Sequence, residues 1–147
     1  MPRCKRTIWA QAMCVAALAT AASAFAQEGP IGFRSPSNNI HCQFWMGDNA
    51  GEVAMRCDVI VISNRPPPRP RDCDLEWGQA FEITGNAGRG ARLCYGDTVR
   101  DERLPVLAYG GTWQRGGLTC ISEETGVTCV NAKGHGFEVA RARQRVF

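Results

Sequence analysis

The chain has 147 residues, 44% of them hydrophobic, and its 17 Lys and Arg against 14 Asp and Glu give a formal net charge of +3. Three of the basic residues, Arg3, Lys5 and Arg6, lie in the first six positions, ahead of every acidic residue. Without that basic start the two signs balance, so the charge gives no support to a nucleic-acid partner.

Residues 1–26 have the three parts of a cleavable signal peptide. The basic start is followed by a mostly apolar run and then by Ala24-Phe25-Ala26, which places small residues at the two positions that signal peptidase reads. The apolar run is shorter than the about 20 residues that a membrane anchor needs. We therefore predict that residues 27–147 form a single exported domain, periplasmic or secreted, with no membrane span after cleavage.

The first half of this domain has a mostly β pattern. We expect strands over residues 39–45 and 53–62, joined by the turn-rich segment 46–51. The proline-rich segment 65–71 is expected to be an extended surface connection, because proline removes backbone donors and fixes φ. A short helical turn is expected over residues 72–77.

The second half continues with short apolar or alternating runs between turn signals. A hairpin is expected from residues 79–84 and 89–95, around the turn at 85–88. Further short strands are expected over residues 106–109, 118–121, 127–131 and 137–143. The pattern predicts an all-β fold with little helix, an antiparallel sheet or sandwich or an open barrel built from hairpins.

Six cysteines follow the predicted signal peptide: Cys42, Cys57, Cys73, Cys94, Cys120 and Cys129. An even number in an exported chain predicts disulfides and argues against thiolate catalysis and zinc binding. Each cysteine lies on or beside an arm of an expected hairpin, so the simplest pairing is sequential: Cys42–Cys57, Cys73–Cys94 and Cys120–Cys129. A disulfide that closes a loop of about 15 residues stabilises a domain by about 3 kcal/mol.

Several short motifs follow one another in a specific order along the chain. They are FRSPSNNIHC at 33–42, CYGDT at 94–98, LAYG at 107–110 with Trp113, GVTCVN at 126–131, GHGF at 134–137 and RAR at 141–143. In this order the chain resembles a family of small secreted bacterial proteins of uncharacterised function. The resemblance implies one exported, cysteine-containing domain, and it supplies no activity and no catalytic residues.

Candidates for catalysis are few. His135 stands between Gly134 and Gly136, which leave the imidazole accessible for binding or proton transfer, although a tight turn explains the same triplet. Asp97 pairs with an arginine, caps a turn or acts as an acid or base. The serines lie in no nucleophile motif and the histidines in no metal motif, so we expect no cofactor and no metal.

Candidates for binding lie near the C-terminus and on aromatic side chains. Arg141, Arg143 and Arg145 alternate, and on a strand they share one face, which either binds an anion or an acidic polymer or protects a sheet edge. Trp113 and Tyr109 either pack in the core or line a binding surface.

The leading interpretation is a non-enzymatic binding domain for an unknown protein or cell-envelope component, recognised through the exposed aromatic side chains and the C-terminal arginines. Two alternatives stay open. One is a small extracytoplasmic hydrolase that uses His135 with Asp97. The other is a purely structural envelope protein with no discrete ligand. The lack of a catalytic motif in the sequence favours the non-enzymatic interpretation.

Overall fold

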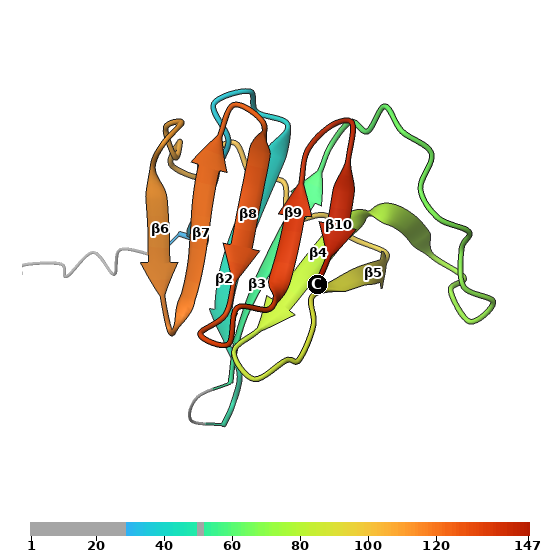
Figure 1. Ribbon diagram of the computed structural model, residues 1–147, viewed down its shortest axis with the longest axis horizontal. Coiled ribbons are helices and arrows are strands. Elements are labelled where there is room, and N and C mark those ends of the chain that lie inside the picture. The colour runs from blue at the N-terminus through green and yellow to red at the C-terminus, as the bar shows by residue number, and fades with distance from the viewer. Residues whose placement is uncertain (1–28, 50–51) are drawn as a thin grey trace, which may run out of the picture.

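In the part of the chain that the structure describes, alternating apolar residues in ten short strands bury one face of each of two antiparallel sheets, which pack face to face (Figure 1). The computed structural model describes residues 29–49 and 52–147. The first sheet runs in chain order through β1 (Ile31–Arg34), β2 (Ile40–Met46), β3 (Val53–Val59), β4 (Glu76–Thr84) and β5 (Ala91–Tyr95). The second sheet runs through β6 (Thr112–Arg115), β7 (Leu118–Glu123), β8 (Gly126–Val130), β9 (Gly136–Val139) and β10 (Gln144–Val146). The predicted all-β class is confirmed, and of the architectures considered the sandwich is the one found.

The inward-facing side chains of both sheets form one core. Its largest fully buried members are Phe33, Phe81, Phe137, Met55 and Ile83. Phe81 of the first sheet meets Phe137 of the second, with ring centroids 6.1 Å apart. Burial of each such side chain stabilises the fold by about 1.5–3 kcal/mol.

Among the described residues, three disulfides join Cys42 to Cys57, Cys73 to Cys94 and Cys120 to Cys129, which is the sequential pairing that the hairpins predict. Two of them link directly opposed residues, across β2 and β3 and across β7 and β8. These two lie in the core, where Cys57 Sγ is 3.9 Å from Cys129 Sγ, so the disulfides of the two sheets pack against each other. The sulfurs of Cys42, Cys57 and Cys129 are close together, but as disulfides they are not thiolate ligands for a metal.

The disulfide between Cys73 and Cys94 differs from the other two in its exposure. Cys94 is exposed, whereas the four cysteines of the core disulfides are fully buried. We expect mild reductant to open Cys73–Cys94 first in the native protein, because thiol–disulfide exchange needs access to a sulfur. Alkylation followed by peptide mass spectrometry measures the order of opening, and early labelling of Cys42 or Cys129 would contradict the prediction.

The expected helical turn over 72–77 is wrong. β4 begins at Glu76, because Glu76 and Trp77 pair with Tyr95 and Cys94 of β5 beyond a register shift. Within the described residues no helix is long and apolar enough to cross a membrane. The predicted signal peptide lies outside the described residues.

Other strand bounds also differ from those expected. β3 ends at Val59 and β9 at Val139, and Val106 forms only a single bridge, to Arg34. β1 and β6 were not among the expected strands, and β1 contains Gly32. This glycine is required by close strand pairing, since a Cβ there would lie 2.0 Å from the Cys42 carbonyl oxygen.

Candidate functional site

Between β5 and β6 the chain crosses the outer face of the first sheet, and we call this segment, residues 96–107, the strap. Side chains from three neighbouring strands hold its backbone. In chain order of the strap, the bonds are Arg56 Nη2 to Asp97 O at 2.7 Å, Gln43 Nε2 to Val99 O at 3.0 Å and Arg34 Nε to Leu104 O at 3.0 Å. The strap thus covers β3, β2 and β1 in turn.

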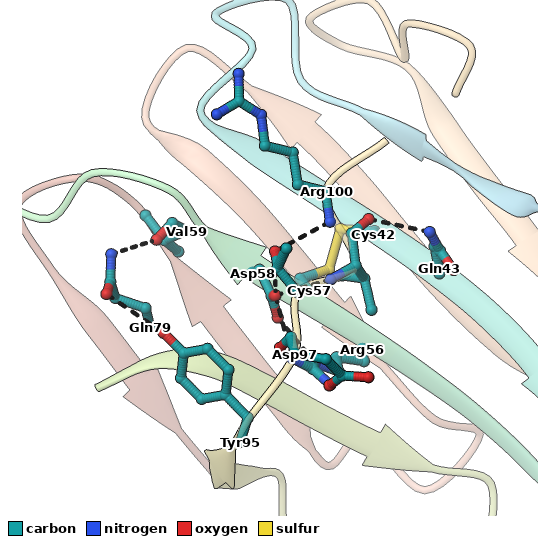
Figure 2. A network of polar contacts seen from close by, with 12 residues as sticks. Cys42, Gln43, Arg56, Cys57, Asp58, Val59, Gln79, Tyr95, Asp97 and Arg100 are labelled. Carbon is teal, nitrogen blue, oxygen red and sulfur yellow. Dashed lines mark hydrogen bonds and ion pairs between the residues drawn. A yellow bond between two sulfur atoms is a disulfide. The ribbon is translucent and has the colours of Figure 1, made fainter. Parts of the chain in front are cut away.

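The strap is anchored on a buried ion pair of β3. Figure 2 shows Arg56 and Asp58 close to Asp97, with the Cys42–Cys57 disulfide beside them. Arg56 and Asp58 are only 8% and 3% exposed, and Arg56 Nε lies 2.9 Å from Asp58 Oδ1. Asp58 Oδ2 also accepts hydrogen bonds from Thr98 Oγ1 at 2.9 Å and from the Val99 backbone at 3.0 Å.

The electrostatics of this network favour its paired state. Burial acts to lower the pKa of the Arg56 guanidinium, but the hydrogen bonds and charges of Asp58 and Asp97 outweigh burial, so that the pKa is raised. Burial, reinforced by the charge of Asp58, raises the pKa of Tyr95, whose ring centroid lies 5.3 Å from the Arg56 guanidinium carbon. The network therefore anchors the strap, and its charged groups are paired with one another.

Asp97 belongs to this anchor. Its Oδ1 lies 3.2 Å from Arg56 Nη1, so of the three roles considered for Asp97 the structure shows arginine pairing. Its side chain is 89% exposed, and its backbone carbonyl makes the shorter bond to Arg56.

His135 lies elsewhere, in the turn between β8 and β9. Its backbone nitrogen donates to Asn131 Oδ1 at 3.1 Å. Gly134 has a φ of +80°, which the turn requires, and a Cβ at Gly136 would lie 1.8 Å from the Cys129 carbonyl oxygen. The glycines thus serve the turn and close strand packing, and in the described residues no hydrogen bond or ion pair joins His135 to Asp97.

The idea that the C-terminal arginines share one strand face is wrong. The chain reverses after β9 so that β10 can pair with it, which places Arg141 and Arg143 in the connecting turn. Arg143 and Arg145 both form ion pairs with Glu138 of β9. Of these three arginines, Arg141 is the one whose side chain makes no hydrogen bond or ion pair with any other residue that the structure describes.

Trp113 and Tyr109 have different environments. Trp113 is half-buried and packs against Phe33 and Phe44, with ring centroids 6.1 and 5.5 Å away. Tyr109 is 44% exposed, in a loop that Gly110 fixes by donating its N–H to the Ser122 carbonyl at 2.7 Å. Trp113 is thus a core residue, and Tyr109 is available at the surface.

Tyr109 and Arg141 line one pocket of about 320 Å³, which we call the end pocket. It lies where the β7–β8 and β9–β10 turns gather with the β1–β2 turn, at the upper end of the sandwich in Figure 1. Its polar lining includes Ser37, Asn39, Glu123, Glu124 and Thr125. Sequence reasoning did not single out these polar residues as one site, because each looks like an ordinary turn residue in its own segment.

The walls of the end pocket are tied together. The Asn39 side chain donates to Val61 O at 3.0 Å and accepts from Val61 N at 2.9 Å. The Ser63 backbone nitrogen donates to Arg141 O at 2.8 Å, which fixes the β9–β10 turn beside the same segment. A pocket held in this way needs little ordering when a ligand binds.

The fold and its covalent links define a small β-sandwich held by three disulfides, which fits an oxidising, extracytoplasmic environment. Residues 12–147 match a family of unknown function, DUF6636, and the chain belongs to this family. Neither a search of curated proteins nor a search of solved structures found a match.

Proposed function

We propose that this protein is an exported, non-enzymatic binding domain whose end pocket holds a neutral saccharide of the cell envelope. The observation that carries the proposal is that two residues line the same pocket: Tyr109, whose ring is exposed, and Arg141, whose guanidinium has no side-chain partner among the described residues. Both residues come from segments that carry the motifs of the family resemblance, 107–110 and 141–143.

The lining chemistry favours a ligand rich in hydroxyl groups. Arg141 supplies only donors, Glu123 only acceptors, and the Ser37 and Thr125 hydroxyls supply both. An array of fixed donors and acceptors beside an aromatic ring suits a sugar, whose hydroxyls need both and whose C–H face stacks on the ring.

The charges of the end pocket argue against an anionic ligand. The two carboxylates of Glu123 and Glu124 outnumber the single positive charge of Arg141, which disfavours the acidic polymer considered from the sequence. Arg143 and Arg145, which would have strengthened an anion site, are already paired with Glu138.

Replacement of Tyr109 or Arg141 by alanine is expected to weaken saccharide binding at least about tenfold, since each removes one principal contact worth about 1.4 kcal/mol or more. Binding to an array of immobilised bacterial and plant saccharides measures the effect. The melting temperature is expected to stay unchanged, because both side chains are exposed.

Arg143→Ala is the matched control for Arg141→Ala, because it removes the same charge from the same turn but outside the end pocket. We expect this variant to bind like the wild type. If the wild type binds no saccharide, or if Arg143→Ala loses as much affinity as Arg141→Ala, the proposal is wrong.

A further inference from the structure

The strap leaves one end of the outer face of the first sheet uncovered, and a second pocket of about 400 Å³ lies there. Its lining includes Trp45 of β2, Ala54 of β3, and Glu82 and Thr84 of β4, with Glu52 at its rim. We call it the face pocket. It lies beside the β2–β3 and β4–β5 turns, at the opposite end of the sandwich from the end pocket (Figure 1).

Strand register explains the shape of the face pocket. Trp45 is paired with Ala54 and Ala54 with Thr84, while Glu82 stands two residues before Thr84 on the same face of β4. The small side chain of Ala54 therefore forms a low floor between two taller walls. Because neighbouring strands lie about 4.8 Å apart, the walls on β2 and β4 are about 10 Å apart. A group seated over Ala54 lies within reach of both.

The two walls carry complementary features for a cation. The indole of Trp45 is 39% exposed, although burial of such a large aromatic side chain is the usual outcome. Glu82 is half-buried, and in the described part of the chain its carboxylate has no hydrogen-bond or ion-pair partner. Burial disfavours the charged form of this carboxylate, the charge of its cross-strand neighbour Arg56 offsets part of that cost, and a bound cation offsets more of it.

The charged side chains that line the face pocket, among the described residues, are both carboxylates. Burial raises the pKa of Glu82, and the nearby charge of Arg56 acts against this, but Arg56 is held by Asp58 and Asp97. Glu52 adds a second carboxylate, and among the described residues the lining contains no lysine or arginine. Lys133 approaches the rim and donates its Nζ to Asn86 O at 3.2 Å.

We propose that the face pocket binds an organic cation, with an alkylammonium group stacked on Trp45 and paired with the carboxylate of Glu82. Tryptophan is the strongest aromatic partner for a cation, and the contact reaches about 2 kcal/mol when it is desolvated. The site is independent of the end pocket and takes a ligand of different charge.

Choline and 3,3-dimethylbutan-1-ol test the proposal, because they have nearly the same shape and differ in the positive charge. In amide and indole NMR spectra of the folded protein, choline is expected to shift the Trp45 indole and the Ala54 and Thr84 amides saturably. The neutral alcohol is expected to bind at least about tenfold more weakly. A third probe, Nα-acetyl-lysine amide, distinguishes a protein lysine from a small quaternary amine as the source of the cation.

Two variants locate the site. Glu82→Gln and Trp45→Leu are each expected to weaken choline binding at least about tenfold, whereas Glu124→Gln, in the end pocket, leaves it unchanged. The same spectra report whether each variant is folded. Equal binding of choline and the neutral alcohol, no saturable shift with any probe, or full binding by a folded Glu82→Gln variant would each overturn the proposal. None of these outcomes bears on saccharide binding at the end pocket.

Discussion

Replacement of Asp58 by alanine is expected to lower the free energy of unfolding by about 3–5 kcal/mol, the usual cost of removing one partner of a buried ion pair. Asp58 is nearly fully buried and accepts hydrogen bonds from Arg56, Thr98 and Val99. Among the described residues, its loss leaves the buried Arg56 charge with Asp97 as its one remaining carboxylate partner, and it releases the start of the strap, at Thr98 and Val99, from β3.

Equilibrium unfolding in urea measures this loss. Glu102→Gln is a suitable control, because it breaks an ion pair with Arg100 on the same strap at an exposed position, where such pairs contribute little. We expect the control to leave the unfolding midpoint nearly unchanged. An Asp58→Ala variant as stable as the control would show that the buried pair does not anchor the strap.

The second large effect is expected from the core disulfide between Cys42 and Cys57. The double variant Cys42→Ala/Cys57→Ala loses the loop constraint, worth about 3 kcal/mol for a 15-residue separation, and also the packing of two buried sulfurs. One of these sulfurs contacts Cys129 of the other disulfide, so the loss leaves a gap between the two sheets.

The double variant Cys73→Ala/Cys94→Ala distinguishes the two contributions. Its loop is longer, at 21 residues, so loop entropy alone predicts an equal or larger loss for this pair. Because Cys94 is exposed, we expect the loss to be smaller than for the core pair. The reverse order of unfolding free energies would show that packing of the core sulfurs adds little.

Both effects meet on β3, which is buried along its whole length. Cys57 faces the second sheet, while its neighbours Arg56 and Asp58 face the strap. The sequence of β3 alternates in polarity, as is typical of a strand with one face in solvent. The strap covers the polar face of β3, although it lies about 40 residues further along the chain. The local pattern therefore predicted that β3 is a strand, but it did not predict that the polar face of β3 is buried.

The disulfides could be predicted from local pattern, whereas the pockets depend on segments that are far apart in the chain. Sequential pairing followed from hairpins, whose arms are neighbours in the chain, and it agrees with the structure. Tyr109 and Arg141 were predicted as binding residues, but their meeting in one pocket depends on turns from both sheets. Glu82 lies within the strand expected over residues 79–84 and was not predicted as a binding residue, because its place beside Ala54 and Trp45 depends on the register of three strands.

NMR chemical-shift mapping with a soluble oligosaccharide chosen from the array tests the proposed function most directly. Saturable shifts at Ser37, Tyr109 and Thr125, with the saccharide left intact, are the predicted result. Shifts centred on His135 or Asp97 together with cleavage of the saccharide would contradict the binding domain and support the hydrolase, and no shift at all would support a purely structural protein.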